Sequence, residues 1–122
     1  MPIPIKPLLL LAEDDDDTRE TIATLLTDAG YEVIPVRHGG EAVSALERGA
    51  RPQAIVLDLA MPVMNGWRFW DWMQTSAFAA IPIIVFTATG LTQGALGAVR
   101  VLQKGRSPNE LLDALRYCTK AA

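Results

Sequence analysis

The segment Gln53–Gly66, QAIVLDLAMPVMNG, carries the clearest indication of the fold, and it begins with an apolar run that ends in a carboxylate. Its first part, Gln53–Asp58, is typical of a strand buried on both faces of a parallel sheet. Similar runs occur on both sides of it. The other predicted strands are Leu8–Ala12, Glu32–Val36, Pro82–Thr87 and a weaker Val99–Gln103.

Amphipathic stretches separate these strands and predict helices. Thr18–Ala29 carries its apolar residues on one helical face and is followed by Gly30, a typical stop. Further helices are predicted at Glu41–Arg48, at Gly66–Thr75 and from Ser107-Pro108-Asn109-Glu110 to Cys118, the last with capping-box spacing. Strands that alternate with helices indicate an α/β fold, a parallel sheet covered on both faces.

Composition and length indicate one globular domain over residues 1–122, with its core at about 8–118. The net charge is −3, but five of the 14 acids are consecutive at Glu13–Asp17, and eleven basic residues outnumber the acids elsewhere. The chain therefore lacks the cluster of basic residues that is typical of nucleic-acid-binding domains. The apolar runs are far shorter than the ~20 residues of a membrane span. With a single cysteine, Cys118, and no signal peptide, we expect a cytoplasmic location.

Reactive side chains follow four of the predicted strands. They are Glu13 and Asp14 after the first, Asp58 at the end of the third, Thr87 at the end of the fourth and Lys104 after the fifth. The carboxyl ends of parallel strands share one edge of the sheet, so these groups should converge. Three carboxylates together favour a hard cation such as Mg²⁺. A lysine and a hydroxyl beside them complete a phosphoryl site, with Asp58 as the nucleophile that forms an aspartyl phosphate.

Each of these residues also has a plainer interpretation. An acidic run before a helix often serves only the helix dipole and solubility. Taken alone, Asp58 and Thr87 would be turn residues, and Lys104 would be exposed to solvent. Their joint occurrence at strand ends favours the functional interpretation.

Four motifs in order resemble the receiver domain of bacterial two-component response regulators. They are LLLLAEDDDDTRE (8–20), IVLDLAMPVMNGW (55–67), PIIVFTA (82–88) and VLQKG (101–105), and the match extends from about Leu8 to Tyr117. The resemblance implies a flavodoxin-like (βα)₅ three-layer sandwich with strand order 2-1-3-4-5.

The resemblance also implies residue roles. Asp58 would be the phosphoacceptor, Asp14 a direct Mg²⁺ ligand, and Glu13 a ligand mostly through water. Thr87 would be the switch hydroxyl and Lys104 the phosphate-binding lysine. Two alanines complete the set of implied positions: Ala60 would offer its backbone carbonyl to the metal, and Ala88 would leave the acceptor open to small donors. Asp15–Asp17 lie outside the motif's metal pair and are interpreted as charges in the first turn of a helix.

The sequence departs from the family pattern near its end. Gly105 replaces the usual proline after the lysine, and Val101 stands where the family often has an aromatic switch residue. Only 17 positions separate Thr87 from Lys104, fewer than in typical members. The weak segment Ala88–Ala98 contains three glycines, so we expect a shortened or missing fourth helix.

The resemblance implies a signalling domain rather than an enzyme, although one that assists its own phosphorylation and dephosphorylation. A histidine kinase or phosphotransfer protein would phosphorylate Asp58, and the phosphorylated form would bind a downstream protein. We expect a monomer or weak dimer, which could be a stand-alone receiver or part of a longer protein.

Two alternatives remain. A degenerate receiver would use the same surface as an interaction module that does not depend on phosphorylation, as the changes at Val101 and Gly105 would allow. A phosphatase of the haloacid dehalogenase type is disfavoured, because such enzymes need a second aspartate where this chain has Ala60.

The tryptophans of the predicted helix Gly66–Thr75 divide into two groups. Trp67 and Trp70 are expected on its buried or half-buried face, together with Phe69 and Met73. Trp72 is expected on the opposite, polar side as a candidate contact patch.

Overall fold

A computed structural model of the chain describes residues 6–58, 66–87, 100–103 and 108–119. The elements in chain order are β1 (Leu8–Ala12), α1 (Asp16–Asp28), β2 (Glu32–Val36), α2 (Gly39–Glu47), β3 (Ala54–Leu57), α3 (Gly66–Gln74), β4 (Ile83–Thr87), β5 (Arg100–Gln103) and α4 (Pro108–Cys118). Among the described residues, none of the helices has the length and apolar character that crossing a membrane requires.

The strands form one parallel sheet in the order β2-β1-β3-β4-β5, which confirms the predicted topology. The central strands β1 and β3 are apolar along their whole length, and all four residues of β3 are buried. At one edge of the sheet, β2 carries an exposed proline, Pro35. Proline is tolerated there because an edge strand has no neighbour on one side to accept a ladder hydrogen bond.

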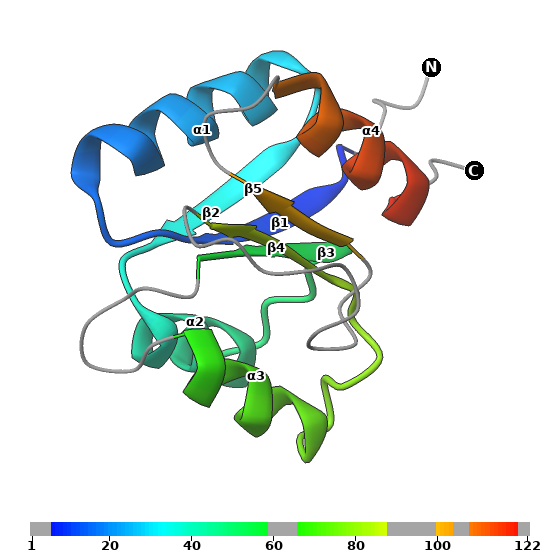
Figure 1. Cartoon of the computed structure of the whole chain (residues 1–122). Coiled ribbons are helices and arrows are strands. Elements are labelled where there is room, and N and C mark those ends of the chain that lie inside the picture. The colour runs from blue at the N-terminus through cyan, green and yellow to red at the C-terminus, as the bar shows by residue number, and fades with distance from the viewer. Residues whose placement is uncertain (1–5, 59–65, 88–99, 104–107, 120–122) are drawn as a thin grey trace.

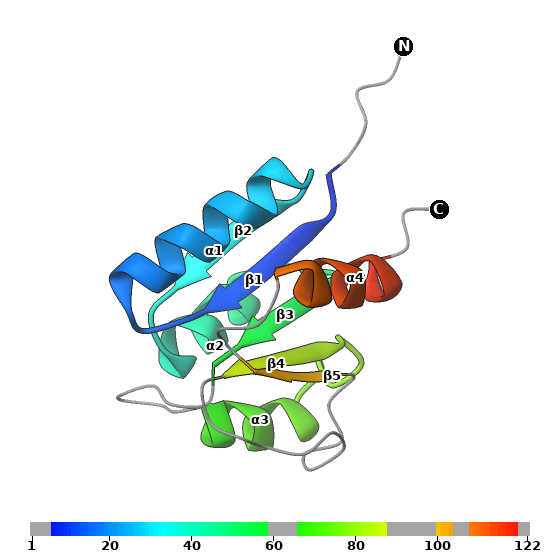
Figure 2. The ribbon, with the colours of Figure 1, turned by 45° about the horizontal axis from the view of Figure 1, so that its top comes forward.

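Helices cover both faces of the sheet, as predicted for a three-layer sandwich (Figures 1 and 2). Helices α1 and α4 lie on one face, and α2 and α3 lie on the other. Each face has its own buried cluster: Ile22, Leu26, Leu111 and Leu115 pack over one, and Ala42, Leu46, Phe69 and Met73 pack over the other. The sheet is therefore held between two cores, so reactive side chains are expected at the ends of its strands rather than on its faces.

Two helices begin earlier than their apolar patterns predict, because polar caps lie upstream of those patterns. Helix α1 begins at Asp16 rather than Thr18, since the side chain of Asp15 accepts a hydrogen bond from the Thr18 N–H at 2.8 Å. Helix α2 begins at Gly39, since Nδ1 of His38 accepts the Glu41 N–H at 3.2 Å. The predicted loss of the fourth family helix concerns residues 88–98, which lie outside the described residues.

The prediction for the tryptophans of α3 is wrong at two positions. Phe69 and Met73 are buried and Trp70 is half-buried, as expected, but Trp67 is 45% exposed. Trp72 packs against the core and stacks on Phe69 at 6.2 Å between ring centroids. Helical geometry explains both errors: Trp67 lies about 200° around the helix from Phe69, whereas Trp72, three residues on, shares its face.

Removal of the α1 cap should destabilise the protein measurably. We expect Asp15→Ala to lower the free energy of unfolding by about 1 kcal/mol, because the backbone N–H and hydroxyl of Thr18 both lose their acceptor. Urea unfolding measures the change. Asp17→Ala is the control, because it removes an exposed first-turn acid without removing the cap. Equal losses for the two variants would contradict the capping role.

Candidate functional site

The carboxyl ends of β1 and β3 position the acidic residues. Ala12 of β1 is in register with Leu57 of β3, so the next residue of each strand emerges at the same edge of the sheet. Backbone hydrogen bonds fix both: the Asp58 N–H donates to the Ala12 carbonyl, and the Glu13 N–H donates to the Val36 carbonyl, each at 3.0 Å.

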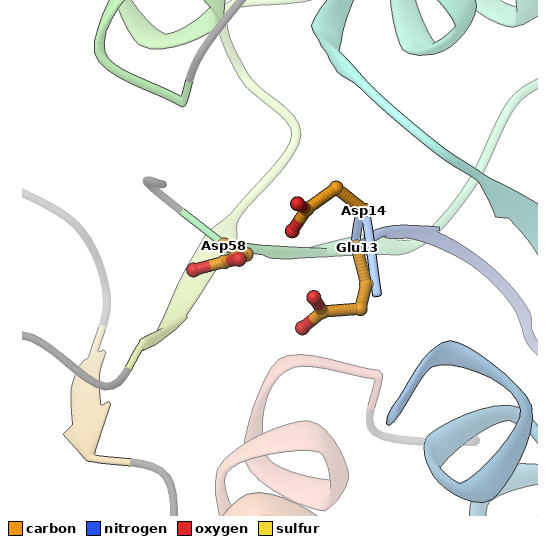
Figure 3. Close-up of side chains that lie close together, drawn as sticks. All are labelled: Glu13, Asp14 and Asp58. Atoms are coloured by element: carbon orange, nitrogen blue, oxygen red, sulfur yellow. The ribbon is translucent and has the colours of Figure 1, made fainter. Parts of the chain in front are cut away.

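Three carboxylates come together at this edge. Carboxylate oxygens of Glu13, Asp14 and Asp58 lie within 4.8 Å of one another, and their side chains converge on a common space (Figure 3). Glu13 is 1% exposed and Asp58 is 4% exposed, whereas Asp14 is exposed to solvent. The structure thus brings together the three acids that the strand ends singled out.

The cluster is suited to a divalent cation. Like charges held close together repel one another, two of these three acids are nearly buried, and a divalent cation among them would offset that repulsion. The carboxylate oxygens lie within 4.8 Å of one another, so one small cation could contact several of them. The donor set of hard oxygens also matches the preference of Mg²⁺.

The loop that carries two of these acids is tied down at several points. The Asp15 N–H donates to Oε2 of Glu13 at 3.1 Å, and the Arg19 N–H donates to the Asp15 carbonyl at 2.8 Å. The guanidinium of Arg19 also reaches this loop. The sequence analysis did not single out Arg19. The feature that could have indicated it is a basic residue in the first helical turn, directly after the acidic run.

The other predicted site residues are described only in part or not at all. Thr87 is the last residue of β4 and is in register with Gln103, but its side chain is not among the described parts. The backbone of Val101 lies in β5 opposite Val85. Ala60, Ala88 and Lys104 lie outside the described residues. The phosphate-binding half of the site therefore remains a prediction.

Comparison with protein families and curated relatives points in one direction. A family model described as the response regulator receiver domain matches residues 9–116. The chain is 32% identical over 122 residues to a probable transcriptional regulator ycf27 of Porphyra purpurea. The match covers 96% of this chain and 49% of that relative. It is 31% identical over 106 residues to protein Rrf1 of Nitratidesulfovibrio vulgaris, covering 85% and 76%. The chain spans about half the length of the ycf27 relatives that it matches.

Solved structures of response regulators are also similar to this chain. The chemotaxis response regulator CheY4 of Vibrio cholerae superposes with a TM-score of 0.81 at 30% identity, covering 93% of this chain and 99% of that one. The receiver domain of a Pseudomonas aeruginosa sensor histidine kinase, solved with a magnesium ion in its active-site cleft, gives 0.86 at 28% identity, covering 96% and 100%. The order of the strands and the acidic edge of the sheet agree with the family model and with the solved structures. Together they show that the chain belongs to the receiver-domain family of response regulators, the signalling domains of two-component systems.

Proposed function

We propose that this receiver domain accepts a phosphoryl group on Asp58 from a histidine kinase or phosphotransfer protein, and that Mg²⁺ held by Glu13, Asp14 and Asp58 is required. The observation that carries the proposal is the meeting of these three carboxylates at the carboxyl edge of β1 and β3. Phosphorylation then changes the affinity of the domain for a downstream protein.

Asp58 is the nucleophile of the proposed reaction. One of its carboxylate oxygens attacks the phosphorus atom, and the bond from phosphorus to the donor's nitrogen or oxygen breaks, so that the leaving group keeps the electron pair. Strand β3 and the bond from the Asp58 N–H to Ala12 hold the acceptor at the edge of the sheet. Mg²⁺ supplies positive charge that screens the phosphoryl oxygens from the carboxylates.

Glu13 and Asp14 prepare the site for the cation. The Asp15 N–H donates to the buried Glu13 carboxylate and orients it. The Asp14 carboxylate is exposed to solvent, so it can give up its bound water and bind the metal instead. Family resemblance supports further roles for the Ala60 carbonyl, the Thr87 hydroxyl, Ala88 and the Lys104 ammonium. We place the domain, residues 1–122, in the cytoplasm, where these phosphoryl donors act.

A small phosphodonor tests the proposal directly. We expect acetyl phosphate to add one phosphoryl group per chain when Mg²⁺ is present, and none when a chelator removes the metal. Intact-mass spectrometry detects the product, and hydroxylamine should cleave it, because an acyl phosphate is attacked at its carbonyl. A hydroxylamine-resistant adduct, or no adduct at all, would contradict the aspartyl phosphate and favour an interaction module that does not depend on phosphorylation.

A further inference from the structure

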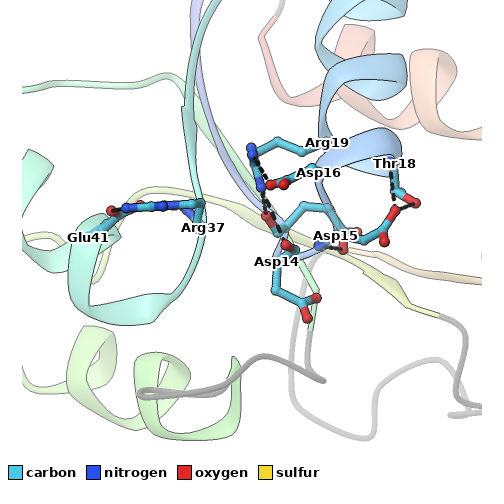
Figure 4. Close-up of polar contacts among 8 residues, drawn as sticks. Asp14, Asp15, Asp16, Thr18, Arg19, Arg37 and Glu41 are labelled. Atoms are coloured by element: carbon cyan, nitrogen blue, oxygen red, sulfur yellow. Dashed lines mark hydrogen bonds and ion pairs between the residues drawn. The ribbon is translucent and has the colours of Figure 1, made fainter.

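Arg19 bends back from α1 onto the loop that carries two of the three site acids (Figure 4). Its Nη1 donates to the backbone carbonyl of Glu13 at 3.1 Å and to that of Asp14 at 3.4 Å. The Arg19 side chain is only 18% exposed; its bond to the Glu13 carbonyl is partly buried, and its bond to the Asp14 carbonyl lies at the surface. One guanidinium group therefore holds two consecutive peptide carbonyls, those of the residues whose side chains converge with Asp58.

An ion pair sets the orientation of the guanidinium. Its Nη2 pairs with Oδ1 of Asp16, one helical turn away on α1. The Asp16 carboxylate is 83% exposed, and such a surface pair by itself adds little stability. Its effect is geometric, because it fixes the rotamer that directs Nη1 toward the loop.

Arg19 completes a set of bonds that fixes the backbone between β1 and α1. The Glu13 N–H is bound to the Val36 carbonyl, the Asp15 N–H to the Glu13 side chain, and the Asp15 carbonyl to the Arg19 N–H. The Arg19 side chain supplies donors for the two carbonyls that precede Asp15. Hydrogen bonds within the protein thus hold the loop at several points, and such supporting bonds are what prepare a binding site.

We propose that Arg19 is a positioning residue for the divalent-cation site: by holding the Glu13 and Asp14 carbonyls, it fixes the direction of both carboxylates before the cation binds. This inference rests on the proposed function, because it concerns the same acidic cluster. Arg19 touches neither the cation nor the phosphoryl group in this role, and it acts through the backbone of the ligands.

Electrostatics alone predicts the opposite effect, which makes the proposal testable. A guanidinium beside the site repels a cation, so its removal should tighten Mg²⁺ binding if charge were its only contribution. If positioning dominates, removal should weaken binding. Outer-shell partners of metal ligands typically change affinity 10- to 100-fold, and a backbone-mediated partner belongs at the lower end.

A second arginine provides a matched control. Arg19 and Arg37 line the same surface groove of about 560 Å³, together with Asp16, Glu20, Ala23 and Pro35. Arg37 is paired with Glu41 at 3.1 Å, and its side chain is 65% exposed. The pKa of Glu41 lies below its ordinary value, mainly because its carboxylate accepts a hydrogen bond from the Arg37 backbone N–H and secondly because it pairs with the Arg37 guanidinium. The substitution Arg37→Met keeps the backbone hydrogen bond.

Mg²⁺ titrations of four proteins test the inference, with tryptophan fluorescence and calorimetry as readouts. We expect the Mg²⁺ dissociation constant to rise about tenfold in Arg19→Met and by an intermediate factor in Arg19→Lys, whose ammonium keeps the charge but loses the planar fork. Arg37→Met removes the same charge from the same groove and should bind Mg²⁺ no more weakly than the wild type. Thermal unfolding in the absence of Mg²⁺ establishes that each variant is folded.

The outcomes separate the inference from the proposed function. Unchanged or tighter Mg²⁺ binding by Arg19→Met would overturn the positioning role and leave the metal site intact. An equal loss in Arg37→Met would overturn it too, because the effect would then not depend on the hydrogen bonds to the Glu13 and Asp14 carbonyls, which come from Arg19. If Arg19→Met fails to fold, Arg19→Lys and Asp16→Ala decide, since the alanine removes the acceptor of the Arg19 Nη2 group, and wild-type affinity in both would refute the role. Absence of Mg²⁺ binding by the wild-type protein would instead contradict the proposed function itself.

Discussion

Replacement of Asp58 with asparagine is expected to abolish phosphoryl labelling by acetyl phosphate, the largest effect that a single substitution should have on this protein. The amide has nearly the same shape as the carboxylate, but its nitrogen and carbonyl oxygen are far weaker nucleophiles. The hydrogen bond from the residue 58 N–H to the Ala12 carbonyl belongs to the backbone, so the variant keeps it. The loss of label should therefore reflect chemistry rather than unfolding.

Asp71→Asn is the control for this experiment. Asp71 is an exposed aspartate of α3, and its substitution causes the same change of charge away from the cluster. It should leave the extent and rate of labelling unchanged, as measured by intact-mass spectrometry over time. Persistence of one label per chain in Asp58→Asn would assign the phosphoacceptor to another residue and contradict the proposed reaction.

The positions of the acids could be predicted because they depend on strand ends. Each apolar run, such as Leu8–Ala12, stops where charged or polar residues begin, and parallel pairing carries these endpoints to one edge. The convergence of Glu13, Asp14 and Asp58 then follows from the strand order, with no knowledge of side-chain contacts. The coarse pattern was sufficient for this part of the site.

Contacts made by individual side chains could not be predicted in the same way. The two hydrogen bonds from Arg19 come from a guanidinium that also pairs with Asp16. The hydroxyls of Tyr31 and Thr119, 88 positions apart, meet at 3.2 Å in the interior. Such pairings depend on how helices pack on the sheet, and apolar periodicity carries no information about them.

Removal of Asp14 is expected to weaken Mg²⁺ binding about 100-fold, the upper end of the range for outer-shell partners, and more than any other substitution outside Asp58. Asp14 is the exposed member of the cluster, so Asp14→Ala leaves no cavity, and the variant should fold. It also removes one of three like charges within 4.8 Å, so the metal-free variant should be at least as stable as the wild type. A loss of affinity would then come from the lost ligand and not from a damaged fold.

Urea unfolding with and without Mg²⁺ measures both effects in one experiment. A cation that binds only the folded state raises the free energy of unfolding by RT ln(1 + [Mg²⁺]/Kd), so the wild type should gain stability steadily as Mg²⁺ is raised. Asp14→Ala should lose most of that gain at each concentration. Asp17→Ala, a first-turn acid of α1 outside the cluster, should keep it. If the two variants gain equally, Asp14 is not a ligand, and the cation site must rest on Glu13 and Asp58 alone.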